Sequence, residues 1–114
     1  MFKFERLEVW KKAIAFADKI NLLTEKLPQR EQFSLGEQLR RASLSIPTNI
    51  AEGTGRDGVK EARYFYPIAK GSVYEVANLL VICRIRKHLS DERYEEMYEQ
   101  ADEIAKMLTG LRGK

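Results

Sequence analysis

The chain has few of the residues that metal and redox chemistry need. Its 114 residues include one cysteine, one histidine and one tryptophan. A lone Cys83 cannot form an internal disulfide, and its apolar neighbours favour a small buried hydrophobe over a reactive thiol. The sequence has no CxxC or HExxH spacing and no glutamate three residues before His88, so neither a zinc site nor a helical di-metal site is expected. We therefore predict no cofactor, no metal and no enzymatic activity.

Long hydrophobic runs are also lacking. The longest apolar run, residues 79–83, is far too short to cross a bilayer, and the first ten residues lack the apolar run of a signal peptide. We expect a cytoplasmic protein with no membrane partner. A composition of 44% hydrophobic and 32% charged residues suits a single folded domain over residues 1–114.

Four segments carry apolar residues at alternating steps of three and four, which predicts four helices. They are expected at about residues 7–27, 35–53, 59–88 and from residue 91 onward. Short links between amphipathic helices predict an all-α, antiparallel up-down-up-down four-helix bundle. The third helix is expected to bury a seam made of Phe65, Ala69, Val73 or Ser72, Val76, Leu80 and Cys83.

Particular residues are expected to shape the helix ends and axes. Ser34 and Glu37 have the spacing of a capping box, and Ser90 is a good N-cap for the last helix. Pro47 and Pro67 each remove a backbone hydrogen bond, so bends are predicted, the second one between residues 63 and 72. The glycines of residues 52–58 (EGTGRDG) predict a turn rather than a phosphate-binding loop, because no strand precedes them.

The first helix has a second apolar line beside its heptad seam. This line consists of Leu7, Trp10, Ile14 and Ala17. Two stripes on one helix indicate either a broad core face or burial against another subunit.

Two stretches carry a family resemblance. Residues 38–53 (QLRRASLSIPTNIAEG) and 65–75 (FYPIAKGSVYE) resemble the four-helix-bundle protein family of intervening sequences in bacterial 23S rRNA genes. The resemblance runs from residues 7–13 (LEVWKKA) to the last helix, and it implies an antiparallel bundle that assembles into a ring-like homopentamer. A relative, the accessory variability determinant of diversity-generating retroelements, is a basic pentamer that binds nucleic acid and a reverse transcriptase. The resemblance therefore implies other copies of the chain, RNA or DNA, and a reverse transcriptase or another protein as partners.

A polar stripe opposes the apolar stripe of the second helix. Arg41 and Glu52 are eleven residues apart, close to three turns, and share one face. Asn49, Glu52 and Glu75 match motif positions of the family. The first interpretation is a buried or half-buried network that fixes register between helices or subunits. The second is a ligand or nucleic-acid site made of the same residues.

Basic residues are unevenly distributed. The net charge is +3, but residues 1–88 carry 16 Lys/Arg against 10 Asp/Glu, whereas residues 89–114 carry 4 against 7. Phosphate contacts need such cations, and a ring would repeat one patch around its axis. The candidate nucleic-acid-binding residues are Arg40, Arg56, Lys60, Arg63, Lys70, Arg84, Arg86 and Lys87. The alternative is ordinary solvated surface.

The sequence thus predicts a non-catalytic nucleic-acid-binding or scaffolding accessory protein that acts as a basic pentameric ring. The alternative is a protein–protein interaction module with no nucleic-acid role, in which the basic surface docks an acidic partner.

Overall fold

The computed structural model, which describes residues 1–111, consists of helices. Two short 3₁₀ segments, η1 (Lys3–Arg6) and η2 (Gln29–Glu31), accompany four α-helices. The α-helices are α1 (Glu8–Glu25), α2 (Leu35–Thr54), α3 (Val59–Ile85) and α4 (Asp91–Leu111). This part of the chain contains no strand. The predicted all-helical class with four helices is confirmed.

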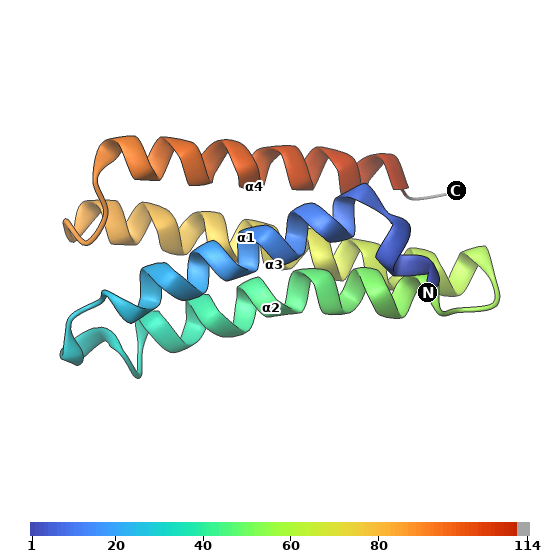
Figure 1. Ribbon diagram of the computed structural model, residues 1–114, viewed down its shortest axis with the longest axis horizontal. Coiled ribbons are helices and arrows are strands. Elements are labelled where there is room, and N and C mark those ends of the chain that lie inside the picture. The colour runs from blue at the N-terminus through green and yellow to red at the C-terminus, as the bar shows by residue number, and fades with distance from the viewer. Residues whose placement is uncertain (112–114) are drawn as a thin grey trace.

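The four α-helices lie along one long axis of a molecule that measures 44 × 24 × 22 Å (Figure 1). Helix α1 contacts α2 and α4, and α3 contacts the same two helices. Each connection turns the chain back along the axis (Figure 1). As a result, η1 and the α2–α3 turn lie at one end, while η2 and the α3–α4 turn lie at the other. We call these the N-terminal end and the η2 end.

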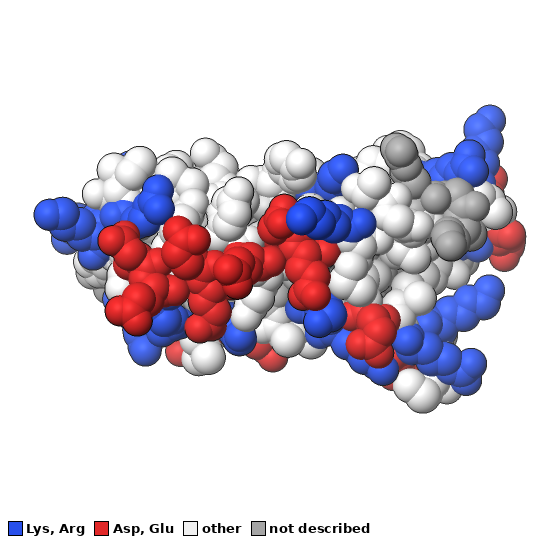
Figure 2. All heavy atoms as spheres, turned by 90° about the horizontal axis from the view of Figure 1, so that it is seen from above, with Lys and Arg blue, Asp and Glu red and all other residues white. Residues whose placement is uncertain are grey.

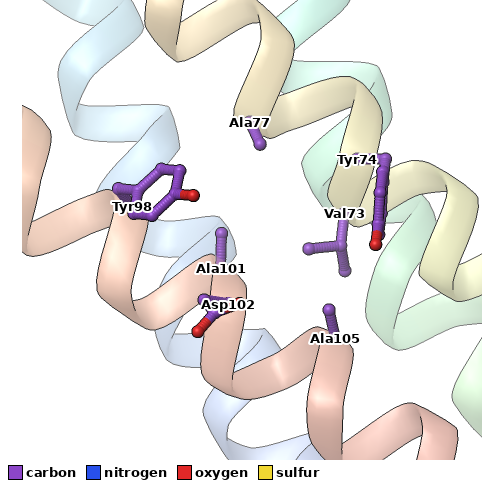
Figure 3. Close-up of a pocket in the computed structure, with 7 residues that line it drawn as sticks. All are labelled: Val73, Tyr74, Ala77, Tyr98, Ala101, Asp102 and Ala105. Carbon is purple, nitrogen blue, oxygen red and sulfur yellow. The ribbon is translucent and has the colours of Figure 1, made fainter.

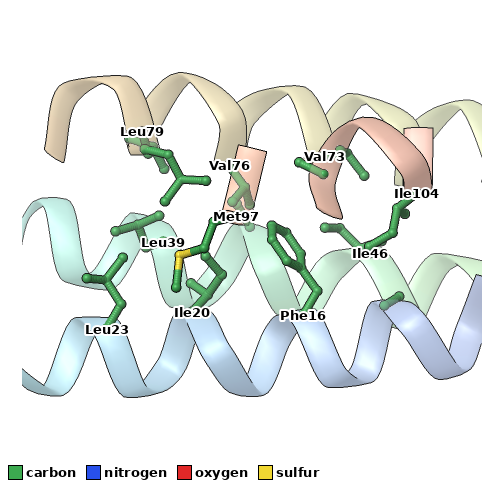
Figure 4. Close-up of a cluster of buried hydrophobic side chains, with 14 of the residues drawn as sticks. Phe16, Ile20, Leu23, Leu39, Ile46, Val73, Val76, Leu79, Met97 and Ile104 are labelled. Carbon is green, nitrogen blue, oxygen red and sulfur yellow. The ribbon is translucent and has the colours of Figure 1, made fainter. Parts of the chain in front are cut away.

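The core follows the predicted seams with one shift in register. Phe16, Ile20, Ile46, Val76 and Met97 are fully buried and interdigitate between the helices (Figure 4). The first turns of α3 differ from the prediction, because Ala62 and Tyr66 are buried there and Phe65 is only half-buried. The spacing of three and four still holds from Ala62 through Tyr66 to Ala69, so the expected seam was misplaced by one residue at this end.

Gly53 permits a close approach between α2 and α3. A Cβ atom at this position would lie 2.5 Å from Cε1 of the buried Tyr66 ring. Only glycine leaves room for that ring. Gly53, near the end of α2, is therefore needed for packing against α3 as well as for the turn that follows.

The second apolar line of α1 packs mainly within the chain. Leu7 and Trp10 are half-buried and pack against the core, and Ala17 is buried. The ring of Phe4, in η1, meets the Trp10 ring edge-on at a centroid distance of 4.9 Å. These contacts fit the interpretation of a broad core face.

The two predicted N-caps have different outcomes. Ser90 Oγ accepts a hydrogen bond from the Arg93 N–H at 3.1 Å, as predicted for the start of α4. The capping box of Ser34 and Glu37 is wrong, because the Ser34 side chain makes no cap bond. Its hydroxyl instead donates to the Glu31 backbone oxygen and carboxylate, at 3.4 and 3.3 Å.

Both prolines lie inside continuous α-helix. Helix α2 passes through Pro47 and α3 passes through Pro67, and residues 63–72, where the second bend was predicted, are α-helical throughout. Within the described residues, no helix is both long and apolar enough to cross a membrane.

Candidate nucleic-acid interface

Three predicted basic residues lie near the α2–α3 turn. Arg56 pairs with Glu52 at 3.6 Å, and its guanidinium lies over the Phe65 ring, 4.4 Å from the centroid. Lys60 and Arg63 are exposed on the first two turns of α3. Neither has an ion-pair partner among residues 1–111, so these two cations are the ones most available to a phosphate backbone.

At the η2 end, the predicted basic residues contact other parts of the fold. The Arg84 guanidinium lies 4.0 Å from the Tyr94 ring centroid and joins α3 to α4. Arg86 pairs with Glu31 at 3.0 Å. Lys87 is exposed and has a positive φ of 65°. Arg84 and Arg86 therefore make contacts that stabilise the fold. Of these three cations, Lys87 is the one that projects into solvent.

Lys87 occupies a Schellman turn that ends α3. The Lys87 N–H donates to the Arg84 carbonyl at 3.0 Å, and the His88 N–H donates to the Cys83 carbonyl at 2.8 Å. This pattern needs a left-handed residue, usually glycine, at the position that Lys87 fills. It explains why α3 ends at Ile85, three residues before the predicted end.

Arg40 and Lys70 belong to neither group. Arg40 Nη2 donates to the Gln32 carbonyl at 2.8 Å, and the Gln32 amide in turn donates to the Thr24 and Leu27 carbonyls. Arg40 therefore holds the α1–α2 connection in place. Lys70 is half-buried in the middle of α3.

Apart from Arg40 and Lys70, the predicted cations lie at the two ends of the bundle, and α4 presents the opposite charge. Figure 2 shows a band of acidic side chains on the face above α4, with basic side chains at both ends. Three ion pairs border it, Lys12–Glu103, Lys19–Glu96 and Lys106–Asp102, at 3.4, 3.6 and 3.0 Å. The exposed acidic residues of α4 are Asp91, Glu92, Glu95, Glu96, Glu99, Asp102 and Glu103. This face repels a polyanion, so phosphate contacts must lie elsewhere.

The polar stripe does not form a buried network within one chain. Arg41, Glu52 and Glu75 are exposed, and Arg41 pairs with no acidic residue in the described part. Asn49 Nδ2 donates to the Ser45 carbonyl and hydroxyl, both at 2.9 Å, and the Ser72 hydroxyl bonds to the Ser45 hydroxyl at 2.9 Å. The polar link from α2 to α3 therefore runs through Ser45 and Ser72. A network of Arg41, Asn49, Glu52 and Glu75 between subunits stays a prediction.

Sequence reasoning missed a polar cluster around a buried carboxylate at the η2 end. His88 Nε2 and Arg86 Nη1 lie 2.9 and 3.0 Å from the same Glu31 oxygen. The side chains of Glu31 and His88 are 9% and 8% exposed. The hydrogen bond from His88, helped by Arg86 and opposed by burial, lowers the pKa of Glu31 below its usual 4.5. These residues are more than 50 positions apart in sequence, so no local pattern could have paired them.

Cys83 lies next to this cluster and is fully buried. Burial, with a smaller effect of the Glu31 charge, raises the pKa of its thiol to about 11. The thiolate is the reactive form of cysteine, so this environment fits the interpretation of a buried hydrophobe. Across residues 1–111, no three His, Cys, Asp or Glu side chains gather to hold a metal ion.

A shallow hollow between α3 and α4 is built differently from a phosphate site. It has a volume of about 150 Å³ and is lined by Tyr74 and Tyr98, by small apolar residues and by Asp102 (Figure 3). No cation lines it, and Asp102 would repel a phosphate group. The hollow therefore adds nothing to a nucleic-acid surface.

These observations define a small four-helix protein with cationic ends and an acidic fourth helix. The model of the 23S rRNA-intervening sequence protein family matches residues 5–110. The chain belongs to that family. No curated protein matches it.

A solved structure has the same fold. It is the crystal structure of a protein of unknown function from the S23 ribosomal protein family of Bacteroides thetaiotaomicron. The two chains superpose with a TM-score of 0.86 over 93% of this chain and 99% of the other, at 24% sequence identity. At this identity, the likeness shows a shared fold.

Proposed function

We propose that the protein is a non-catalytic accessory protein that binds nucleic acid through its cationic ends. The observation that carries this proposal is the separation of charge along the molecule. Lys60, Arg63 and Lys87 are exposed at the ends with no ion-pair partner among residues 1–111. A band of seven exposed acidic side chains lies along α4 (Figure 2). Contacts of this kind hold a phosphate backbone without reading its sequence, because neutralised phosphates release their counterions.

We further propose that antiparallel up-down-up-down subunits assemble into a homopentameric ring, which would repeat each cationic end five times. The family resemblance suggests the pentamer, and the outer surface of α3 suggests where the subunits meet. That surface exposes large apolar side chains, with Ile68, Tyr74 and Ile85 exposed by 40%, 64% and 71%. Three such residues on one helix suit burial against a neighbouring subunit. In the cytoplasm, the ring would present nucleic acid to a reverse transcriptase or another protein.

A filter-binding titration tests the nucleic-acid role. Wild type should retain RNA and DNA of unrelated sequence at low salt, and log affinity should fall linearly with log salt. A Lys60→Gln/Arg63→Gln variant should bind more weakly, with a slope on duplex DNA that is shallower by about 0.9 for each lost contact. These two side chains are a cleaner probe than Arg56, whose loss would also remove its contacts with Glu52 and Phe65.

A matched control removes the same charge elsewhere. Lys12→Gln/Lys19→Gln loses two cations that pair with α4, at a cost of about 1 kcal/mol or less each because both pairs are largely exposed. This variant should bind nucleic acid nearly as well as wild type. Equal losses in both variants would show that net charge alone matters, and no retention of wild type at low salt would refute the nucleic-acid role.

The second candidate function is a protein–protein interaction module. One observation favours it: Arg40, Arg56, Arg84 and Arg86 are engaged in contacts within the fold. The cations left free could then dock an acidic protein partner. Retention of an acidic protein but not of nucleic acid at the same ionic strength would favour this module.

A further inference from the structure

A stack of aromatic rings leads from the core to the surface at the N-terminal end. Trp10 packs against the core, and Phe4 meets it edge-on. The Phe2 ring stacks on Phe4 at a centroid distance of 5.8 Å and an interplanar angle of 12°. Phe2 ends the stack with 73% of its surface exposed. One face of this ring is covered by Phe4, so the other is open to a further planar group.

The backbone at Phe2 is held in place. Its N–H donates to Glu5 Oε2 at 2.9 Å, and its carbonyl accepts from the Glu5 N–H at 3.2 Å. Because Phe2 is tied on both sides to the first turn of η1, its ring is positioned before any ligand arrives. A positioned aromatic loses little conformational entropy on binding.

A cavity of about 380 Å³ lies between η1 and the end of α2. Its volume is within the range of about 300–1,000 Å³ that small-molecule sites occupy. Phe2 and Phe4 form its aromatic wall, Lys3 and Arg56 contribute cations, and Asp57 contributes a carboxylate. Ala51, Thr54 and Gly55, at the C-terminal end of α2, complete the lining.

We propose that this cavity holds a base of a single-stranded nucleic acid, stacked on the open face of Phe2. Lys3 and Arg56 then contact the phosphates on either side. This site rests on the proposed nucleic-acid function and specifies the form of nucleic acid that it takes.

The chemistry of the lining separates base from phosphate. The Asp57 carboxylate and the negative end of the α2 dipole repel a phosphate but accept hydrogen bonds from the N–H groups of a base. Cations then keep the backbone at the rim, and the aromatic ring stacks with any base because every base has a π-face. Bases in a duplex are already stacked and paired, so they cannot enter without disrupting the duplex.

The cationic surface continues past the cavity. Arg56 lies in the turn that leads into α3, and Lys60 and Arg63 follow on the first two turns. Tyr64 is 68% exposed beside them. Alternating cations and exposed aromatics along one end of the molecule suit a strand whose phosphates and bases bind in turn.

The test uses the full, untagged chain and three fluorescent probes of equal length: oligothymidylate, its abasic counterpart and a duplex. Fluorescence anisotropy at low salt gives each affinity. Wild type should bind oligothymidylate more tightly than the abasic strand. Phe2→Ala should lower the affinity for oligothymidylate by about 5- to 150-fold, the equivalent of one lost base stack, and leave abasic and duplex binding unchanged. Phe2→Trp should keep or strengthen the preference for bases.

Phe33→Ala is the matched control, because Phe33 is 81% exposed and lies at the η2 end of the molecule. It should bind all three probes as wild type does, and thermal melting should show both alanine variants folded. If wild type binds none of the probes, the proposed function fails. If wild type binds, two results would refute the stacking site but leave the nucleic-acid function standing. In the first, Phe2→Ala binds oligothymidylate as tightly as wild type does. In the second, Phe33→Ala loses as much affinity for oligothymidylate as Phe2→Ala.

Discussion

His88 Nε2 lies 2.9 Å from Glu31 Oε2, although the two residues are 57 positions apart in the sequence. This contact joins the short segment after α1 to the segment after α3, and the Arg86 guanidinium pairs with the same carboxylate. Two connecting segments thus depend on one buried acid, and within the first of them the Ser34 hydroxyl before α2 also bonds to Glu31.

Glu31 should make stability depend on acid pH. A carboxylate with a lowered pKa in the folded state contributes stability that is fully present above its unfolded value and is lost as pH falls through the folded value. Since the pKa of Glu31 is lowered from 4.5, the melting temperature of the wild type should decrease as pH falls below about 4.5. Glu31→Gln should melt at a lower temperature at neutral pH and change less with acid. The exposed Glu95→Gln should match wild type at neutral pH, and equal pH profiles for Glu31→Gln and wild type would contradict the assignment.

The left-handed turn at Lys87 predicts a stabilising substitution. A non-glycine residue in this conformation costs about 1–2 kcal/mol, partly offset by the greater flexibility of glycine in the unfolded chain. Lys87→Gly should therefore raise the free energy of unfolding by about 0.5–1 kcal/mol in urea titrations. Lys87→Ala removes the same charge but keeps the backbone cost, so it should give no gain. A gain in both variants would assign the effect to charge.

The two serines before α2 and α4 offer a test of the observed caps. Ser90→Ala removes the hydrogen bond to the Arg93 N–H and should cost about 0.5–2 kcal/mol, as N-cap losses do. Ser34→Ala removes no cap bond to α2 and should cost less. Chemical denaturation of both variants under identical conditions gives the comparison, and the reverse order would show that the Ser34 bonds to Glu31 outweigh the Ser90 cap.

The close approach at Gly53 predicts overpacking. Gly53→Ala places a methyl group against the buried Tyr66 ring and should cost about 1–3 kcal/mol. Gly110→Ala is the control, because a Cβ there meets nothing within 4 Å and alanine favours helix. Melting curves should show a loss for the first and none for the second. A neutral Gly53→Ala would mean that the Tyr66 ring moves aside freely.

Local patterns predicted most of the fold, because helical spacing reports directly which side chains face the core. The heptad seam of α1 is buried from Val9 to Leu23, and four helices appear where four periodic segments do. Local patterns gave a wrong prediction where a side chain bonds to a residue that the local rule does not consider. Ser34 has the spacing of a cap, yet its hydroxyl bonds to Glu31, whose position depends on Arg86 and His88.

The candidate site was harder to predict for the same physical reason. A sequence shows which residues are basic but not which ones the fold will use, so Arg40 and Arg84 were grouped with freely exposed cations such as Lys60. Arg40 binds Gln32 and Arg84 lies over Tyr94, contacts that only tertiary structure creates. For the polar stripe, the structure shows a contact between Ser45 and Ser72 across α2 and α3, which the sequence did not predict, and a network between subunits stays a prediction.

The exposed apolar face of α3 predicts how assembly can be broken. If Ile68 and Tyr74 are buried between subunits, a glutamate at either position would place a carboxylate in the interface without water or an ion-pair partner. The cost of burying this charge would favour dissociation. Light scattering should report an oligomer for wild type at micromolar concentration, and Ile68→Glu or Tyr74→Glu should shift it toward the 13.2 kDa chain mass. Leu22→Glu is the control, because Leu22 is 56% exposed on α1, away from this face. A monomeric wild type would refute the ring, and an intact oligomer in both α3 variants would move the subunit interface to another helix.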